Sequence, residues 1–337
     1  MLSRKRVFSG LSAASAALVI LAGALAGCSG GGGTTALTPA QPAQNSPAGT
    51  SQQGDERVVQ TVSVNSADAS AIKSSVTHEA AYGLPLQGES PRKLAVGQRA
   101  IRTGGVYDLA FYGGPVLTSA SSINLYVNCG STCWGSPSPG TFIGSLATSS
   151  FVHIIDQYIG SSSNNRYPYG GGWTVNYNTS GTLQDQDIYN IIHAVAVSQG
   201  TGYGKVYHVF LQSGVHQCSS SAGGCYGVSG GYCAYHGNVN FADIGHTIYS
   251  VEPYQGISGC NAPSNKLQDS TGSTLSHELF EAITDPDVPN NVAWYNNYGG
   301  EIGDICRSYY GNVTLTSTVY NIQKEYTNVH SACSFST

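Results

Sequence analysis

The residues best suited to chemistry lie in one short stretch, Ser276-His277-Glu278-Leu279-Phe280-Glu281. His277 and Glu281 are four residues apart, and residues with this spacing share one face of a helix. Leu275 and Ile283 fall on a separate apolar face that would pack against a core. The stretch therefore predicts a helix that is anchored on one side and presents an imidazole and a carboxylate on another.

The same stretch resembles the zincin motif H-E-x-x-H, with Glu281 in place of the last histidine. In that family the two residues four apart bind zinc, and the glutamate between them is the general base. The resemblance implies that His277 and Glu281 are metal ligands and that Glu278 is the base. A third ligand must come from downstream, where Glu301 and Asp304 are the candidates and a gluzincin-like site favours Glu301.

The glutamate at position 281 changes the expected chemistry of the metal. One imidazole with two carboxylates is a harder donor set than two imidazoles with one carboxylate. We expect zinc as the cofactor, and Mn²⁺ or Ca²⁺ stays open. The extra negative charge would also make a metal-bound water less acidic, which weakens the case for hydrolysis. Asp285 is expected to support the ligands by hydrogen bonding from outside.

These residues also have an ordinary interpretation, as surface carboxylates and a packed core histidine. The chain has 19 acidic residues in 337, and six of them lie between Glu278 and Asp304. Charge that is scarce elsewhere and gathered beside a histidine favours a metal or catalytic cluster. His236 follows a tyrosine- and cysteine-containing segment and is a possible residue of the same cleft, although a packed surface loop is the simpler interpretation.

The elements that must position these residues follow from the apolar pattern. Helical spacing predicts helices over 141–158, 183–199 and 270–283. Runs rich in β-branched and aromatic residues predict strands over 106–111, 123–127, 173–177, 205–211, 247–251 and 313–322. Residues 213–245, rich in cysteine and glycine, are expected to form a long loop. Helices and strands mix without strict alternation, so we expect an α+β fold, a zincin-like mixed sheet with packed helices, stabilised by disulfides.

Residues 1–28 have the pattern of an export signal, with Arg4-Lys5-Arg6 before an apolar run from Ala16 to Ala26. The run ends in Leu25-Ala26-Gly27-Cys28, which resembles a bacterial lipoprotein box and implies lipidation of Cys28. We therefore expect an exported protein, anchored by lipid in the bacterial cell envelope. Plain secretion, with Cys28 incidental, is the alternative.

Composition divides the rest of the chain. Residues 29–56 consist of Gly, Ser, Thr, Pro, Ala and Gln with almost no charge, which is typical of a linker. Residues 57–92 are ambiguous, and the globular domain is expected over 93–337. The formal net charge is −5, which excludes the basic footprint of a nucleic-acid-binding protein. The lipid anchor is the only membrane contact that we expect.

Cysteine usage supports export. Without a lipidated Cys28, eight of the nine cysteines remain, an even number that predicts up to four disulfides in an oxidising compartment. Neighbour pairing is the simplest of 105 possible connectivities. The expected pairs are Cys129 with Cys133, Cys218 with Cys225, Cys233 with Cys260, and Cys306 with Cys333.

Several short segments resemble the EXORDIUM / phosphate-induced protein family, which is known from plant cell walls and has bacterial relatives. The segments that carry the resemblance, in chain order, are Tyr112 to Leu117, Ile123–Val127, Val206 to Phe210, Cys233 to His236, Thr284-Asp285-Pro286, Ala293-Trp294-Tyr295 and Glu301 to Cys306. The resemblance spans roughly residues 106–333. It implies an extracellular role, and it implies that part of the family works without this metal site, because plant members tend to lack its acidic and histidine residues.

The sequence thus predicts a lipid-anchored, metal-dependent hydrolase, most simply a peptidase, in which Glu278 takes a proton from a metal-activated water. Its substrate would be a peptide or cell-wall material. The alternative is a non-catalytic binding module of the cell envelope, of the EXORDIUM type, in which the same carboxylates hold a structural metal or form a degenerate site.

Overall fold

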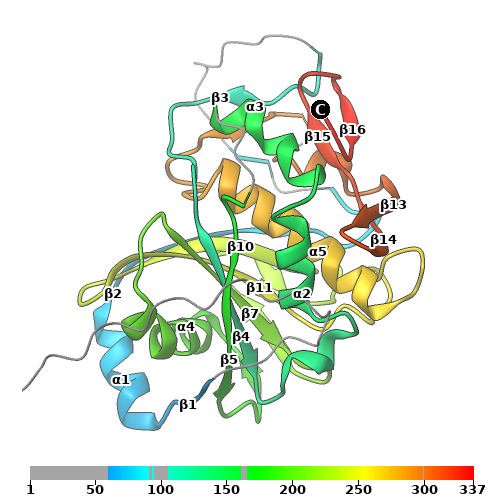
Figure 1. The fold of residues 1–337 in the computed structure, drawn as a ribbon. Helices are drawn as coiled ribbons and strands as arrows, with labels where there is room; N and C mark the ends of the chain where they lie inside the picture. The colour runs from blue at the N-terminus through cyan, green and yellow to red at the C-terminus, as the bar shows by residue number, and fades with distance from the viewer. Residues whose placement is uncertain (1–59, 91–92, 95–104, 161–164, 299) are drawn as a thin grey trace, which may run out of the picture. The chain divides into compact units, whose positions relative to one another are not determined.

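A seven-stranded mixed sheet forms the centre of the fold (Figure 1). The computed structural model describes residues 60–90, 93–94, 105–160, 165–298 and 300–337. The expected signal peptide, the linker and Cys28 lie outside the described residues. In sheet order, the strands are β1 (Gln60–Ser63), β5 (Tyr169–Asn176), β4 (Ser121–Val127), β7 (Lys205–Leu211), β11 (Gly245–Glu252), β10 (Ala234–Phe241) and β2 (Val76–Leu84). Neighbouring strands are parallel from β1 to β11, whereas β10 runs antiparallel to both of its neighbours.

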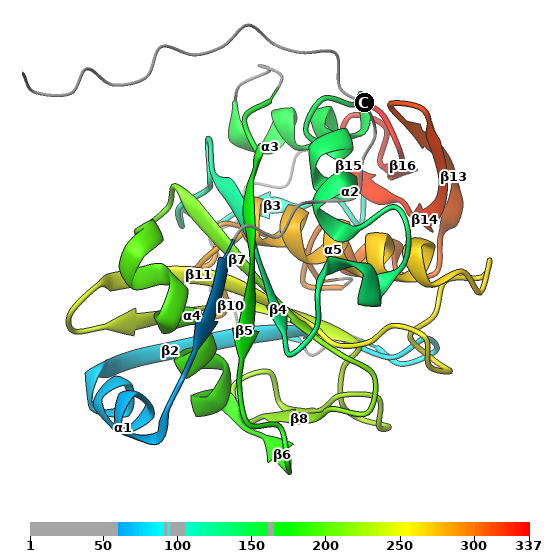
Figure 2. The ribbon, with the colours of Figure 1, turned by 60° about the horizontal axis from the view of Figure 1, so that its bottom comes forward.

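Helices cover both faces of this sheet, as Figures 1 and 2 show. One face carries α1 (Ser66–Ser75) and α4 (Asp185–Gln199), and the other carries α2 (Pro139–Leu146), α3 (Asp156–Ile159) and α5 (Leu267–Thr284). The α+β class and the mixed sheet are therefore confirmed. Within the part of the chain described here, no helix is long and apolar enough to cross a membrane.

The central strands contribute side chains to two separate hydrophobic cores, one on each face of the sheet. Leu125 of β4 and Val209 of β7 pack with α4, whereas Tyr126 and Phe210 pack on the opposite face with α5. Successive side chains of a strand point to opposite faces, so strands buried on both sides appear as continuous apolar runs. The apolar runs over 123–127 and 205–211 therefore predicted β4 and β7 correctly.

Small ribbons and turns surround the central sheet. The hairpins and ribbons pair β3 (Ala110–Phe111) with β12 (Trp294–Tyr295), β13 (Tyr310–Leu315) with β14 (Thr318–Gln323), β15 (Glu325–Thr327) with β16 (Ala332–Ser334), and β6 (Thr182–Leu183) with β8 (His216–Ser219) and β9 (Gly224–Cys225). Three 3₁₀ turns complete the described elements: η1 (Ser131–Trp134), η2 (Phe151–Ile155) and η3 (Asp304–Cys306).

Four disulfides join the cysteines in the neighbour pairing expected from the sequence. Cys233–Cys260 and Cys306–Cys333 each close a separation of 27 residues, while Cys129–Cys133 closes one of only four. The two long bridges flank the segments that carry His236, α5 and η3. The covalent framework therefore supports the part of the molecule in which the acidic stretch lies.

The expected loop over 213–245 is wrong, because it contains the short strands β8 and β9 and, in its second half, the buried strand β10. This strand contains His236, Gly237, Asn238 and Asn240, so its polar composition hides it from an apolar pattern. Gly237 is required there: a Cβ at this position would lie 2.2 Å from the carbonyl oxygen of Ala80 on β2.

Other boundaries also differ. The helix expected over 141–158 is broken after Leu146, where Ser149 Oγ donates to the Leu146 carbonyl (2.8 Å) and competes with the helical ladder. The strand expected over 313–322 is a hairpin, with Thr316 at a positive φ of 56° in its turn. Of the strand expected over 106–111, only Ala110–Phe111 forms. The ambiguous segment 57–92 supplies β1, α1 and β2, so the fold begins before Lys93.

Candidate metal centre

Helix α5 is the scaffold of the centre, and every residue from Asp269 to Thr284 is buried. A helix buried on all sides must satisfy its own hydroxyl groups. Ser276 Oγ donates to the Gly272 carbonyl and Thr284 Oγ1 to the Phe280 carbonyl, each at 2.9 Å. The helix ends at Asp285 because the following Pro286 cannot continue it.

Two imidazoles and four carboxylates meet beside this helix. His277, Glu278 and Glu281 come from α5, and His236 comes from β10, which packs against α5. The remaining two carboxylates, Glu301 and Asp304, come from the segment that leads into η3. Each of the six side chains is at most 1% exposed.

His236 lies at the middle of the cluster. Its Nδ1 is 3.2 Å from Glu278 Oε2 and 3.5 Å from Glu281 Oε2, and its Nε2 is 3.6 Å from Glu301 Oε1. A proton on Nδ1 would be donated to Glu278, which leaves the Nε2 lone pair free to bind a cation. His236, Glu281 and Glu301 accordingly offer three ligand atoms within 4.8 Å of one another.

His277 approaches Glu281 from the other side, with 3.1 Å between Nε2 and Oε1. Gln323 Nε2 donates to the Gly303 carbonyl (2.8 Å) and lies 2.9 Å from His277 Nδ1. Because the amide nitrogen faces Nδ1, the ring proton belongs on Nε2, where it points at Glu281. A second set of possible ligands consists of His277, Glu278 and Glu281. His277 would bind a cation through Nε2 only if the side-chain amide of Gln323 rotated by 180°, so that its oxygen accepted a proton from Nδ1.

Two glycines allow the η3 segment to approach this closely. A Cβ on Gly303 would lie 2.3 Å from His277 Nδ1, and a Cβ on Gly300 would lie 2.3 Å from Asp304 Oδ2. Asp304 contacts Glu281 through its backbone N–H (3.1 Å to Oε1), and its own Oδ2 accepts from the Glu301 N–H (3.3 Å). Asp304 therefore holds the loop that carries Glu301.

Asp285 lies at the end of α5, outside the two ligand sets. Its Oδ1 accepts from the Ala293 N–H at 2.7 Å, and its Oδ2 has no hydrogen-bond partner among the described residues. It ties the chain that follows α5 to the segment leading to Glu301. This hydrogen bond goes to the backbone and not to a ligand, so the supporting role expected for Asp285 from the sequence stays a prediction.

The electrostatics of the cluster reflect its burial. Burial raises the pKa values of Glu278, Glu301 and Asp304 well above their usual ranges, and the neighbouring Glu281 carboxylate raises them further. For Glu281 the effect of burial is outweighed by His277 and His236, which lower its pKa to about 2. In return Glu281 raises the pKa of His277 despite burial. Glu281 is thus the permanent negative charge of the cluster.

Two further buried carboxylates were not predicted from the sequence. Glu325 on β15 is fully buried, and neither oxygen has a hydrogen-bond partner among the described residues. Glu252 on β11 accepts from Ser250 Oγ (2.8 Å), which also lies 2.8 Å from His208 Nδ1, and burial raises the Glu252 pKa to about 7. Each is an isolated acidic residue in a strand, and no motif or spacing marks it.

A divalent cation fits these donors. Buried atoms that have no hydrogen-bond partner within the described part of the chain include His236 Nε2, Glu281 Oε2 and both oxygens of Glu301. His236 Nε2 and Glu301 Oε1 are 3.6 Å apart, close to the spacing of about 3.3 Å between neighbouring ligands on a tetrahedral zinc ion. Nitrogen and carboxylate oxygen together suit zinc or manganese.

The structure thus brings together His277, Glu278, Glu281, Glu301 and Asp304, as expected from the sequence, and adds His236 to them. His236, expected only as a possible cleft residue, is the central imidazole. Asp304, expected as a ligand, donates its backbone N–H to Glu281, and His277, also expected as a ligand, pairs with Glu281 at 3.1 Å. Comparisons of the chain with protein-family models, with curated proteins and with solved structures find no match, so the resemblance to the EXORDIUM family stays a prediction.

Proposed function

We propose that this protein is a divalent-metal-dependent hydrolase of amide bonds, a peptidase in the simplest case, with zinc as its first candidate metal. His236, Glu281 and Glu301 would hold the ion. Asp304 would keep Glu281 in place by donating its backbone N–H to Glu281 Oε1, and His277 Nε2 lies 3.1 Å from the same oxygen. When bound, such an ion polarises a carbonyl group and lowers the pKa of a water molecule.

One observation carries this proposal. Seven carboxylates are at most 1% exposed, and among the described residues no lysine or arginine is equally buried. They belong to Glu252, Glu278, Glu281, Asp285, Glu301, Asp304 and Glu325. Burying unpaired carboxylates is costly, and a divalent cation placed among His236, Glu281 and Glu301 would compensate that charge.

Glu278 is the proposed general base. Its Oε2 faces His236 Nδ1, and its Oε1 has no hydrogen-bond partner among the described residues. Burial raises its pKa, so the free oxygen would take a proton from the attacking water. The backbone of α5 fixes Glu278 beside Glu281, three residues away on the same helix.

The test is hydrolysis of a panel of amide substrates by the metal-loaded protein and its Glu278→Gln variant. General-base catalysis contributes about 10²–10⁴-fold, so the variant should lose activity by that factor while keeping its metal. The matched control is Glu325→Gln, which removes a buried carboxylate that belongs to neither ligand set. Equal rates for the wild type and Glu278→Gln would refute the role of Glu278.

A structural ion is the second candidate function, and the burial of the donors favours it. Structural sites are closed, whereas catalytic sites keep an open position, and all six side chains of the cluster are at most 1% exposed. A structural ion would exchange slowly with a chelator and would raise the melting temperature without supporting hydrolysis. A catalytic ion would be removed quickly, and activity would return on its replacement.

The compartment is part of the same proposal. Four disulfides suit an oxidising environment, which fits export and lipid anchoring at Cys28. We propose a substrate in or outside the cell envelope, a peptide or cell-wall material. Metabolic labelling with a radioactive fatty acid, compared between the wild type and Cys28→Ala, tests the anchor.

A further inference from the structure

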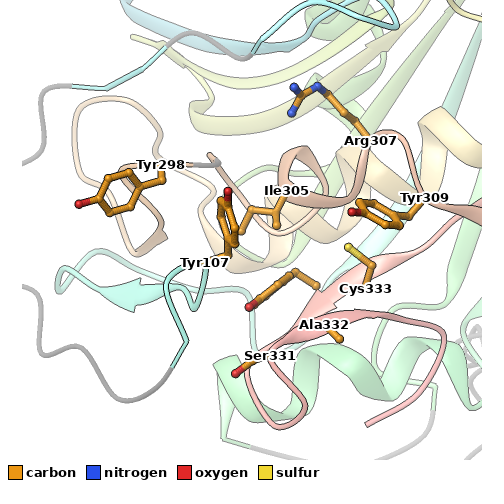
Figure 3. A pocket seen from close by; sticks show the side chains of 9 residues that line it. Tyr107, Tyr298, Ile305, Arg307, Tyr309, Ser331, Ala332 and Cys333 are labelled. Carbon is orange, nitrogen blue, oxygen red and sulfur yellow. The ribbon is translucent and has the colours of Figure 1, made fainter.

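A pocket of about 540 Å³ is lined by Ile305 of η3, by residues that follow η3 and by β16 (Figure 3). Tyr107, Tyr298 and Tyr309 line it, and they are 52%, 62% and 59% exposed. Its volume lies within the range of about 300–1,000 Å³ that small-ligand sites occupy. Among the described residues that line it, Arg307 is the one charged side chain.

The three tyrosines come from three segments that buried polar groups tie together. Asn296 is 5% exposed, and its Nδ2 donates to the carbonyls of Val106 and Asp108, at 3.1 and 2.8 Å. Its Oδ1 accepts from the Tyr298 N–H at 2.8 Å. Asn296 therefore fixes the segment of Tyr107 and the segment of Tyr298 relative to each other.

Hydrogen bonds and a disulfide also hold the other segments that line the pocket. Asp108 accepts from the Gly105 N–H (2.6 Å) and from the hydroxyl of the buried Tyr326 (3.0 Å), which also lines the pocket. The Cys306–Cys333 disulfide joins η3 to β16. Arg307 donates from Nε to the Glu89 carbonyl (2.9 Å) and from Nη1 to the Asp304 carbonyl (3.1 Å). The exposed rings are thus held on a rigid frame.

We infer that this pocket is a binding site for an oligosaccharide, neutral or acidic. A sugar ring has apolar C–H faces that pack on aromatic rings and hydroxyl groups at its edge that need polar partners. Tyrosine offers an apolar face and a hydroxyl in one rigid side chain, and Arg307 and Ser331 add donors at the same pocket. Backbone segments fixed in advance lose little conformational freedom when a ligand binds.

The inference goes beyond the proposed hydrolase and does not depend on the metal ion. Of the groups that line the pocket, none belongs to the two ligand sets. The carbonyl of Asp304 holds Arg307, so the pocket and the cluster share η3 as a wall. A bound sugar chain would accordingly lie beside the centre, and the binding itself would persist without metal.

The experiment is titration calorimetry of the chelator-treated and the metal-loaded protein with cellohexaose, chitohexaose and hexagalacturonate. We expect at least one of these probes to bind with a similar dissociation constant in both forms. Tyr298→Ala and Tyr309→Ala should each raise that constant at least tenfold, because both rings are exposed and their loss leaves the core intact. Tyr309→Trp, which keeps a ring for stacking, should restore most of the binding.

Tyr203→Ala is the control, because Tyr203 is a 42% exposed tyrosine that does not line this pocket, and it should leave the constant unchanged. Asn296→Ala tests the frame and should weaken binding without removing a ring. The inference is overturned if no oligosaccharide binds, if the ring variants bind as the wild type does, or if short peptides compete for the pocket and sugars do not. The activity of Glu278→Gln tests the hydrolase proposal and does not affect the oligosaccharide titrations. Either proposal can therefore be refuted without refuting the other.

Discussion

At the residue scale, the centre depends on how closely η3 approaches α5. Gly303 has an ordinary φ of −80°, so its backbone would accept alanine without strain. The obstacle is steric, because a Cβ would lie 2.3 Å from His277 Nδ1. The absence of a side chain at Gly303 lets Gln323 and His277 meet, and His277 in turn holds Glu281.

We predict that Gly303→Ala destabilises the protein by about 1–3 kcal/mol, the usual cost of overpacking, and weakens metal binding. Denaturant unfolding and a competitive chelator assay measure the two effects. Gly144→Ala in α2 is the matched control, since nothing lies within 4 Å of its Cβ, and an exposed helical glycine gains about 0.5–1 kcal/mol on replacement by alanine. Wild-type stability and affinity in Gly303→Ala would contradict the close approach.

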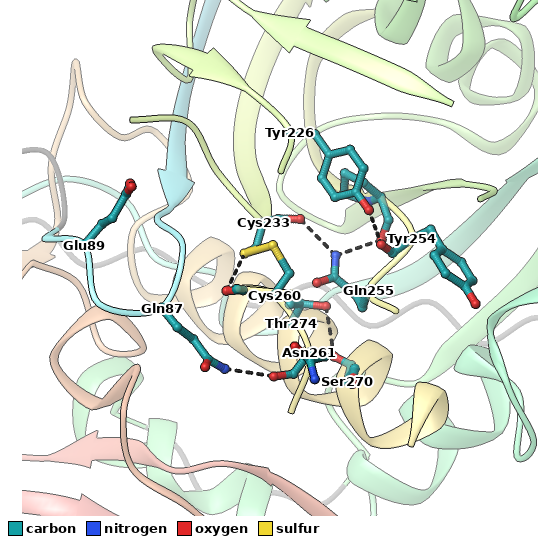
Figure 4. Close-up of a disulfide and its surroundings, with 12 residues drawn as sticks. Gln87, Glu89, Tyr226, Cys233, Tyr254, Gln255, Cys260, Asn261, Ser270 and Thr274 are labelled. Carbon is teal, nitrogen blue, oxygen red and sulfur yellow. Dashed lines mark hydrogen bonds between the residues drawn. A yellow bond between two sulfur atoms is a disulfide. The ribbon is translucent and has the colours of Figure 1, made fainter. Parts of the chain in front are cut away.

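At the element scale, the disulfide Cys233–Cys260 joins the start of β10 to the loop before α5 (Figure 4). Gln255 supports the same corner, where its Nε2 donates to the carbonyls of Cys233 (2.9 Å) and Pro253 (2.7 Å). Three residues after Cys233 comes His236. The bridge therefore fixes the strand of one imidazole relative to the helix of the other.

Removing this bridge should cost more than removing the short one. In the chain-entropy description, a loop of 27 residues is worth about 3–4 kcal/mol and a loop of four about 2 kcal/mol. We predict that the double variant Cys233→Ala/Cys260→Ala loses more free energy of unfolding than Cys129→Ala/Cys133→Ala, measured in denaturant at equal metal loading. A larger loss from the short bridge would contradict this account.

Some helices and strands could be predicted from the sequence, and others could not. The α5 helix and its acidic block were predictable, because apolar spacing marks the helix and carboxylates are scarce elsewhere in the chain. Strands β4 and β7 were predictable because they are apolar on both faces. β10 was not, since its buried positions carry His236 and Asn238, and their partners lie on α5 and beyond it in the loop after Asp285. Only the tertiary structure supplies those partners.

At the scale of the whole molecule, the buried carboxylates link stability to pH and to metal. Burial raises the pKa values of Glu278, Asp285, Glu301 and Asp304 in the folded state, and that of Glu252 to about 7. Each group holds its proton more tightly when folded than when unfolded, so its contribution to stability is present at low pH. That contribution is lost as the pH rises above about 4, the unfolded value, and through the folded pKa.

We therefore predict that the chelated protein loses stability between pH 5 and pH 8, whereas the metal-loaded protein does not, because the ion replaces the protons. Glu281, with its pKa lowered to about 2, acts in the opposite direction and destabilises only as the pH falls below about 4. Melting temperatures with zinc and with chelator, taken across this range, measure the effect. A metal-dependent gain in melting temperature that shrinks as the pH rises would contradict the prediction.

The most direct test of the central claim is the metal content of the purified protein, measured by mass spectrometry with its disulfides intact. The wild type should carry close to one zinc or manganese ion per chain. His236→Ala and Glu281→Gln should lose the ion. His277→Ala should keep it with affinity reduced about 10–100-fold, as expected for a residue that supports a ligand. An ion-free wild type, or equal metal in the wild type and Glu281→Gln, would contradict the account.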